Sequence, residues 1–398
     1  MKGIQGWCGR LVIALMCSGV AGMSLAGGLV IQSFDSTGQL AFNTLPTATV
    51  YRVEWASSPN GPWTNSWAAL AAIPHPSTGG IVTCSVPMCY RVVATVTNYQ
   101  SMADDYLVID LSAGSSATTY PVSQLAGVPE GGCSDEYKTT KIVLKRIRAG
   151  SFTMGSPDAE LGHRTDEAIF PVSLSQDFYI GLFEVTQRQW ERVMGSWPSY
   201  FNNVSYRESR PVEKVSYETI RGADWQGADW PASGNVGPNS FMGRLRTRTG
   251  RMFDLPTEAQ WEYAARAATT TALNSGSNLT STDNCPNMAE VGRYWHNGGS
   301  SSGADSTTAN GTAKAGSYRV NAWGLYDMHG NVYEWCLDWY GSYPTSGSDP
   351  KGALTGTGRV FRSGSWVERA GYCRAASRLY IAANSTYNFL GLRVVVLP

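Results

Sequence analysis

The residues of this 398-residue chain that could bind a metal ion lie mainly in one short segment, 327–334. Its two carboxylates, Asp327 and Glu334, enclose Gly330, and a glycine permits the tight turn that would aim backbone carbonyls inward. Calcium takes about six to eight oxygen ligands and mixes carboxylates with carbonyls. The segment therefore predicts a calcium site. The alternative is that the two carboxylates only accept hydrogen bonds from backbone amides and fix a loop.

His329 lies in the same segment and could serve as a metal ligand or as a base. The chain has only four histidines, and they are spread over separate parts of the sequence. We therefore expect the His329 ring to form hydrogen bonds with neighbouring backbone.

Cysteines are the second type of residue that could carry chemistry. The chain has eight, and six of them follow residue 26: Cys84, Cys89, Cys133, Cys285, Cys336 and Cys373. An even number in an exported chain permits disulfides in about 15 connectivities. The sequence has no CxxC pair and no cysteine near a histidine at zinc spacing, so we favour structural disulfides over a zinc site.

Two short helices are predicted by the same starting signal. In residues 186–195, Thr186 can cap the free amides while Gln189 bonds back, and Gly195 ends the helix. In residues 256–266, Thr257 and Gln260 repeat the pattern. Residues 142–147 are a strand candidate that precedes both.

Residues 27–112 are predicted to form a small all-β module. Residues 51–55 alternate polar and apolar side chains, turn residues follow at 58–62, and residues 89–96 are a second strand candidate. This pattern resembles a fibronectin type III-like or related sandwich, which would serve as a spacer or adhesive module. Residues 113–140, enriched in Ser, Thr, Gly and Pro, are predicted to be a linker to a domain at 141–398.

Charge and composition exclude some classes of protein. Basic and acidic residues balance at 31 each, so nothing favours nucleic acid or an anionic membrane surface. Charged residues are 16% of the chain, and 43 glycines and 14 tryptophans suggest ordered loops with buried indole rings.

Residues 1–26 have the features of a signal peptide. Lys2 and Arg10 give a basic start, an apolar run follows, and Ser24 and Ala26 are small residues suited to a cleavage site. The run is shorter than the ~20 apolar residues that span a bilayer. We therefore expect a secreted, periplasmic or cell-surface protein with no membrane span after cleavage.

Seven collinear sequence blocks resemble the formylglycine-generating enzyme, or sulfatase-modifying factor, family. They include the segment 327–334 and lie at residues 152–156, 183–187, 210–216, 255–266, 321–335, 362–366 and 390–393. The resemblance covers about 240 residues and implies an α+β, C-type-lectin-like domain with little regular structure. It also implies a calcium site in which Asp327 and Glu334 bind through side chains, and Gly330 and Val332 through backbone oxygens. A second calcium site of the family would use Asn287 and the Met288 carbonyl.

The family's oxidases bind copper(I) with a cysteine pair, five residues apart, after a Gly-Gly-Ser motif, and soft thiolates suit that ion. Ser365 matches the serine of that motif. Counting forward from it places Glu368 at the first cysteine position and Cys373 at the second. Counting backward from residues 390–393 makes Arg378 the family arginine and leaves Cys373 at neither position. In both alignments a copper thiolate is missing, so copper is not expected.

Cys373 is then expected to be structural, with Cys336 as its disulfide partner. The loop closed by that bond would have ~37 residues, for a stabilisation of about 3–4 kcal/mol.

Three functions remain open. The domain could be a non-oxidase that binds a peptide, a glycan or an exported protein in a groove, with Trp366, Tyr372, Arg378 and Tyr380 as candidate contacts. It could be a divergent oxidase that makes formylglycine, with Ser365 and Cys373 as catalytic residues. It could also be a structural surface-display protein.

Overall fold

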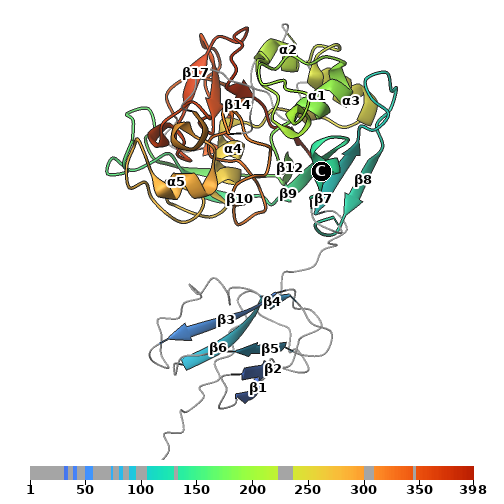
Figure 1. The fold of residues 1–398 in the computed structure, drawn as a ribbon. Helices are drawn as coiled ribbons and strands as arrows, with labels where there is room; N and C mark the ends of the chain where they lie inside the picture. Colours follow the sequence, from blue (N-terminus) through green and yellow to red (C-terminus); the bar gives the residue numbers. More distant parts are fainter. Residues whose placement is uncertain are drawn as a thin grey trace, which may run out of the picture. The chain divides into compact units, whose positions relative to one another are not determined.

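A computed structural model describes residues 105–129, 133–222, 236–299, 309–343 and 347–398, together with the backbone of six strands between residues 31 and 95. The chain divides into two units, Met1–Ser101 and Met102–Pro398 (Figure 1). The predicted signal peptide and the side chains of Cys84 and Cys89 lie outside the described residues.

The first unit is built from short antiparallel strands. They form two three-stranded sheets with the orders β1-β2-β5 and β4-β3-β6. The strands are β1 (Ile31–Phe34), β2 (Gln39–Phe42), β3 (Val50–Ala56), β4 (Ile73–Pro74), β5 (Gly80–Thr83) and β6 (Cys89–Thr95). The two strand predictions at 51–55 and 89–96 are confirmed as β3 and β6, which pair along their whole length. The fibronectin type III-like resemblance stays a prediction.

The predicted boundary between the units is wrong. Residues 106–110, which the prediction assigns to the small module, form strand β7 (Tyr106–Asp110), and residues 122–125 of the predicted linker form β8 (Val122–Leu125). Both instead pair into the sheet of the larger unit, where β7 lies between β8 and β9 (Lys141–Ile147). The cause is burial, since Leu107 and Ile109 are at most 1% exposed in the main core. A linker of polar composition thus contains a sheet strand.

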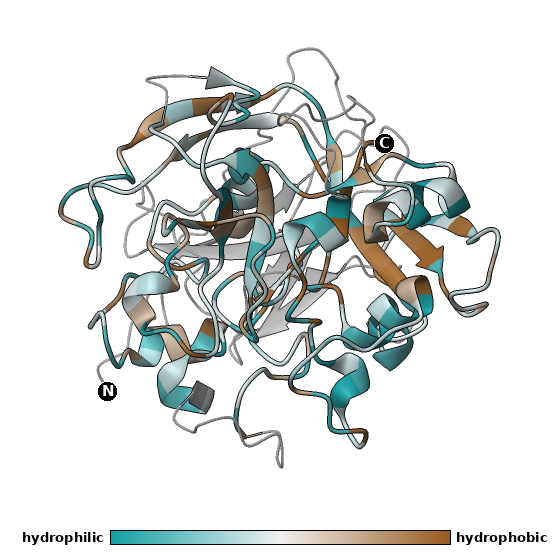
Figure 2. Ribbon diagram, turned by 90° about the horizontal axis from the view of Figure 1, so that it is seen from above, coloured by the Kyte–Doolittle hydropathy of each residue, from teal (hydrophilic) through white to brown (hydrophobic). Residues whose placement is uncertain are grey.

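A six-stranded sheet forms one side of the larger unit. Its order is β13-β19-β12-β9-β7-β8, with the remaining members β12 (Phe178–Gly181), β13 (Phe253–Asp254) and β19 (Val395–Val396). The predicted strand at 142–147 is confirmed as β9, which buries Ile142, Leu144 and Ile147. Figure 2 shows these hydrophobic strands beside helices coloured mostly as hydrophilic.

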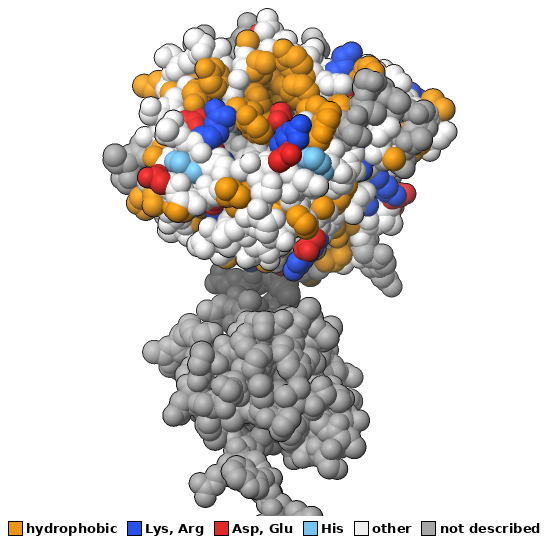
Figure 3. Space-filling model, turned by 60° about the vertical axis from the view of Figure 1, so that its left-hand side comes forward, with side chains coloured by type: hydrophobic (Ala, Val, Ile, Leu, Met, Phe, Trp, Pro, Cys, Tyr) orange, Lys and Arg blue, Asp and Glu red, His pale blue; other side chains and the backbone are white. Residues whose placement is uncertain are grey.

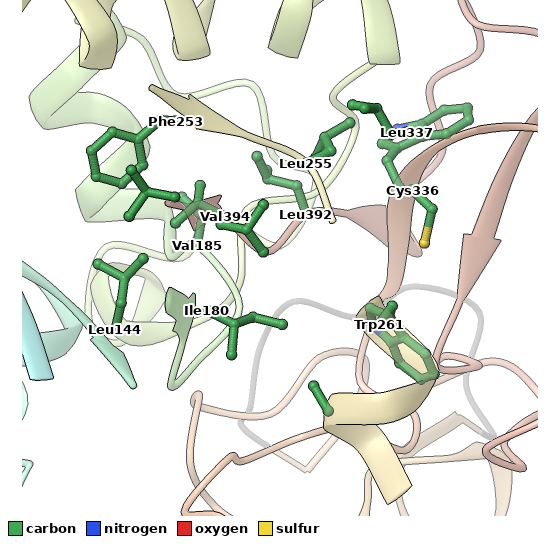
Figure 4. Packing of buried hydrophobic residues seen from close by; sticks show 14 of the residues in the cluster. Leu144, Ile180, Val185, Phe253, Leu255, Trp261, Cys336, Leu337, Leu392 and Val394 are labelled. Atoms are coloured by element: carbon green, nitrogen blue, oxygen red, sulfur yellow. The ribbon is translucent and has the colours of Figure 1, made fainter. Parts of the chain in front are cut away.

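A four-stranded sheet includes the end of the predicted metal-binding segment 327–334. Its order is β17-β16-β14-β18, formed by β14 (Tyr333–Trp339), β16 (Arg359–Arg362), β17 (Leu379–Ile381) and β18 (Leu390–Gly391). A third sheet joins β10 (Gly150–Met154), β11 (Phe170–Leu174) and β15 (Gly347–Ser348). Figure 4 shows Leu392 and Val394 packed among Leu255, Ile180 and Val185. Residues far apart in the sequence therefore pack in the same hydrophobic core.

The described residues of this unit also form five short α-helices. They are α1 (Gln187–Met194), α2 (Tyr217–Arg221), α3 (Phe241–Thr249), α4 (Glu258–Arg266) and α5 (Pro286–Val291). Both predicted capping boxes are present, with Thr186 and Gln189 at the start of α1 and Thr257 and Gln260 at the start of α4. Gly195 ends α1 in the left-handed conformation, as expected. The predicted mixed α and β content is therefore confirmed. Within the described ranges, no helix is long and apolar enough to cross a membrane.

Candidate functional site

The segment 327–334 is a strained, buried turn that leads into β14. Asp327, Gly330 and Asn331 all have positive φ angles, of 56°, 78° and 62°. At Gly330 a side chain is also excluded by space, because an added Cβ would lie 2.0 Å from the Arg293 carbonyl oxygen. The turn therefore needs its glycine.

Glu334 is fully buried and fully hydrogen-bonded. Its carboxylate accepts hydrogen bonds from Nε and Nη2 of Arg393, at 2.7 to 3.1 Å, and from the Trp261 indole N–H at 2.7 Å. A buried arginine–carboxylate pair of this kind is strongly held because both charges are satisfied.

Asp327 is buried, and only one of its two carboxylate oxygens accepts a hydrogen bond from a described residue. One oxygen accepts the Gly316 N–H at 2.6 Å, whereas Oδ1 has no hydrogen-bond partner among the described residues. Burial raises the pKa of Asp327 to about 6. Glu184 lies nearby and accepts the Val332 N–H and the Asn331 side-chain amide, and burial together with Asp327 and Glu334 raises its pKa well above the usual value.

These contacts fit a calcium ion in part. In the described ranges, no three His, Cys, Asp or Glu side chains gather as metal ligands, so a site would depend on backbone carbonyls. The unpartnered Oδ1 of Asp327 suits an oxygen-binding cation, and Gly330 and Val332 follow it in the turn. Glu334 does not fit as it stands, because Arg393 and Trp261 engage both of its oxygens.

The residues of the second predicted calcium site are engaged in other contacts. The Asn287 side-chain amide donates to the Asn278 carbonyl at 2.8 Å, and the Met288 carbonyl accepts the Gly292 N–H at the end of α5. Residues 300–308, where further ligands would fall, lie outside the described residues.

His329 forms hydrogen bonds with backbone, as expected. Its Nδ1 lies 2.7 Å from the Cys373 carbonyl oxygen, and its Nε2 lies 3.0 Å from the Asn274 amide nitrogen. Because a carbonyl only accepts and an amide N–H only donates, Nδ1 carries the proton of a neutral ring. Burial lowers the pKa of His329 to about 4, which keeps the ring neutral. The ring therefore ties segment 327–334 to the turn that contains Cys373.

Ser365 and Cys373 lie side by side, and the half-buried carboxyl group of Glu368 lies near the Cys373 thiol. The Ser365 N–H donates to the Cys373 sulfur, and the Ser365 carbonyl accepts the Glu368 N–H at 3.0 Å. The Ser365 hydroxyl is buried without a hydrogen-bond partner among the described residues. Burial and the nearby Glu368 raise the pKa of the Cys373 thiol, which favours the protonated form.

Glu368 faces the hydroxyl of Tyr333, and burial raises its pKa. Tyr372 and Cys373 lie close to the same hydroxyl. We call these five residues the Glu368 recess: Tyr333, Ser365, Glu368, Tyr372 and Cys373. No Lys or Arg of the described chain forms a salt bridge with Glu368, although the carboxyl is partly exposed.

The predicted disulfide between Cys336 and Cys373 is wrong. Both are free thiols, as are Cys133 and Cys285. The reason is that the two side chains belong to different buried clusters. Cys336 lies on β14 in the main core, in the region that Figure 4 shows, whereas Cys373 packs in a smaller cluster with Met288 and Tyr294.

The four predicted groove residues do not line one groove. Trp366 is 4% exposed, and its indole donates to the Asn388 carbonyl. Arg378 is buried, and two of its nitrogens pair with Glu258 at 2.7 and 2.8 Å. Tyr372 and Tyr380 are exposed, but Tyr372 belongs to the Glu368 recess and Tyr380 stacks on Tyr340.

Figure 3 shows a face of the larger unit on which hydrophobic side chains gather, with acidic, basic and histidine side chains along one edge. The exposed aromatic residues of the described chain are Tyr200, Tyr372, Tyr380 and Tyr387. Sequence reasoning did not assign a role to Glu368 itself. The available signal was the alignment that runs forward from Ser365, which places Glu368 at the first cysteine position.

Comparisons with known proteins agree with these features. Residues 134–397 match the family of the sulfatase-modifying factor enzyme 1-like domain. A chaperone protein, LppX, of Paenibacillus barcinonensis is 33% identical over 249 residues, which cover 56% of this chain and 81% of that protein. The formylglycine-generating enzyme of Mus musculus is 26% identical, over 70% of this chain and 82% of the enzyme. Among solved structures, variable protein 1 of Treponema denticola is 27% identical with a TM-score of 0.50, over 65% of this chain and 96% of that one.

Proposed function

The chain belongs to the sulfatase-modifying factor enzyme 1-like family, and from this premise we propose that it binds a ligand at the Glu368 recess without oxidising it. One observation carries the proposal. In the alignment that runs forward from Ser365, the first thiol of the family's oxidases is replaced by a half-buried carboxyl group, Glu368, which lies near the Ser365–Cys373 pair.

The thiol chemistry supports a non-oxidase. Residues 366–372 contain no cysteine, so Cys373 has no partner at the family spacing. Its raised pKa disfavours the thiolate that a soft metal ion requires. Cys285, which shares the small cluster, instead faces Thr280, whose amide and hydroxyl lie 3.4 and 3.5 Å from its sulfur.

The charge of the recess indicates the class of ligand. Glu368 is partly desolvated and has no cationic side chain of the described residues as a salt-bridge partner. A cationic group from outside would relieve this cost, and Tyr372, which lies close to the Tyr333 hydroxyl that Glu368 faces, offers an exposed aromatic side chain. We therefore propose a peptide segment that carries a lysine or an arginine.

A binding experiment tests the proposal. The full chain would be titrated with unstructured peptides that differ only in Arg, Lys or norleucine at one position, and binding followed by fluorescence anisotropy. We expect the basic peptides to bind at least tenfold more tightly than the norleucine peptide, and Glu368→Gln to remove most of that difference. Glu290→Gln, at an exposed carboxylate that is not one of the five residues of the recess, is the control. Equal binding of all three peptides would refute the proposal.

A divergent oxidase is the second candidate, because Ser365 and Cys373 are adjacent as that activity would require. It predicts stoichiometric copper(I) binding and an aldehyde product from a Cys-x-Pro-x-Arg peptide, seen by mass spectrometry. Our proposal predicts neither. A Cys373→Ser variant tests the oxidase, since any aldehyde formation should cease in it.

The remaining parts of the proposal concern the location of the protein, the role of its first unit and its stabilisation by calcium. We propose an exported protein with a C-type-lectin-like larger unit and a fibronectin type III-like first unit, which would place the binding unit at a distance from an attachment point. We also propose that calcium binds at Asp327 with backbone carbonyls of the same turn. The unpartnered Asp327 oxygen supports this, and bound calcium would supply positive charge to a cluster rich in buried carboxylates.

A further inference from the structure

A second site lies away from the Glu368 recess and shares no residue with it. It is an open pocket of about 470 Å³ between the loop before β11 and the loop after β14. Its lining is Thr165, Asp166, Ala168, Ile169, Phe170, Tyr340, Gly341, Ser342 and Tyr343. The volume falls within the ~300–1,000 Å³ of small-molecule sites.

The walls of this pocket are held rigidly by one buried arginine. Arg378 pairs with Glu258 through two nitrogens and donates from its third, Nη1, to the Gly341 and Asp166 carbonyls, at 2.8 and 3.3 Å. Its guanidinium also stacks 4.6 Å from the Tyr340 ring and 4.0 Å from the Tyr343 ring. Both loops are thus fixed before any ligand arrives, which lowers the entropic cost of binding.

The pocket presents apolar and hydroxyl-bearing surfaces together. Phe170 packs on Tyr343 with ring centroids 4.8 Å apart, and Ile169 is 56% exposed at the rim. Tyr380, 49% exposed, stacks on Tyr340 at 4.0 Å and extends the aromatic surface beyond the rim. Hydroxyl groups come from Thr165 and Ser342.

The charges of the pocket are already balanced. Each side-chain nitrogen of Arg378 is engaged by Glu258 or by a carbonyl, so Arg378 is not available to pair with an anionic ligand. Asp166 accepts the Tyr340 hydroxyl at 2.7 Å and pairs with Arg164 at 3.4 Å, so it does not need a cationic ligand. This differs from Glu368, which faces a tyrosine hydroxyl but has no arginine or lysine partner among the described residues.

A neutral ligand with apolar faces and hydroxyl edges matches this surface. A sugar ring has C–H groups on its faces, which pack on aromatic rings, and hydroxyls at its edge, which bond carboxylate and hydroxyl oxygens. We propose that the pocket between Asp166 and Tyr343 binds one or two units of a neutral saccharide.

The test uses the full chain and a set of disaccharides. Lactose, maltose and chitobiose would be compared with sialyllactose, by saturation-transfer NMR for contact and by calorimetry for affinity. We expect at least one neutral disaccharide to bind, and sialyllactose to bind no better than lactose.

Variants then locate the site. Ala168 is exposed and lines the pocket, so Ala168→Trp should fill it and weaken binding at least tenfold without disturbing the core. Val204→Trp, at a residue 74% exposed and outside the pocket, should leave binding unchanged. Melting curves of both variants check folding.

Two results would overturn the inference: no neutral disaccharide binds, or binding is the same in Ala168→Trp and in the wild type. Glu368→Gln should not alter saccharide binding. Failure of basic peptides at the Glu368 recess and failure of saccharides at this pocket can therefore be told apart.

Discussion

A buried acid outside both sites gives the sharpest quantitative prediction. Glu213 is fully buried, and its Oε1 accepts the Phe201 N–H at 2.9 Å, whereas its Oε2 has no hydrogen-bond partner among the described residues. Burial raises its pKa from 4.5 to about 8, against the smaller opposing effects of the Phe201 and Tyr200 amides. The folded protein therefore holds a proton on Glu213 at neutral pH.

The sign of the pH dependence follows directly. Between about pH 4.5 and pH 8 the carboxyl is protonated in the folded state and ionised in the unfolded state, so unfolding releases a proton. The contribution of Glu213 to the free energy of unfolding is thus full below pH 4.5 and declines as the pH rises to about 8. A difference of about 3.5 pH units sets an upper bound of ~5 kcal/mol. Water entry and relaxation around the ionised group should reduce this to about 2–3 kcal/mol.

The perturbation is Glu213→Gln, which keeps the acceptor for the Phe201 N–H and cannot ionise. We expect the variant to match the wild type within ~1 kcal/mol at pH 5 and to exceed it by about 2–3 kcal/mol at pH 8. Urea unfolding followed by near-ultraviolet circular dichroism at both pH values measures this difference. Other buried acids such as Asp338, whose pKa burial raises to about 7, act equally in both proteins and cancel.

The control is Glu290→Gln, at a carboxylate 59% exposed that pairs loosely with Arg319. It should change stability by less than ~0.5 kcal/mol at either pH. If wild type and Glu213→Gln lose stability in parallel between pH 5 and pH 8, Glu213 is ionised in the folded protein and the reasoning fails.

Three further predictions concern the larger unit. Cys336 and Cys373 should both be alkylated when the protein is denatured without reductant, and peptide mapping that finds them disulfide-linked would contradict the structure. Arg374→Met should lower the free energy of unfolding by about 3–5 kcal/mol, because Glu167 would keep a buried charge without its arginine, and chemical denaturation measures the loss. If calcium binds at Asp327, adding a chelator should lower the melting temperature of the wild type but not of Asp327→Ala, and equal curves with and without chelator would rule out a stabilising ion.

The parts of the fold that sequence could predict depend on neighbours in the chain. Helices α1 and α4 begin at residues whose caps lie within three positions, and their signals can be read locally. Strand β7 could not be found in this way. Tyr106 of β7 pairs with Lys145 of β9, and nothing in the sequence near residue 106 specifies that pairing. The module boundary was therefore set by composition, which does not report strand pairing.

The same limit applies to the candidate site. The sequence marked segment 327–334 and the Ser365–Cys373 region as important, and the structure joins them through the His329 ring. The sequence could not show that Arg393 pairs with the Glu334 carboxylate, or that Cys336 and Cys373 lie in separate buried clusters. Those facts depend on which buried groups meet across distant parts of the chain.

The position of β19 has a consequence for synthesis. This strand lies between β12 and β13 in the six-stranded sheet. Its residues, Val395 and Val396, come later in the sequence than all the other described strands. The ribosome synthesises the chain from its amino terminus. The first unit and most of the larger unit are therefore made before β19 can pair with β12 and β13. The nascent larger unit must wait for β19 with β12 and β13 unjoined, and such unpaired edges are exposed to aggregation until β19 has been made.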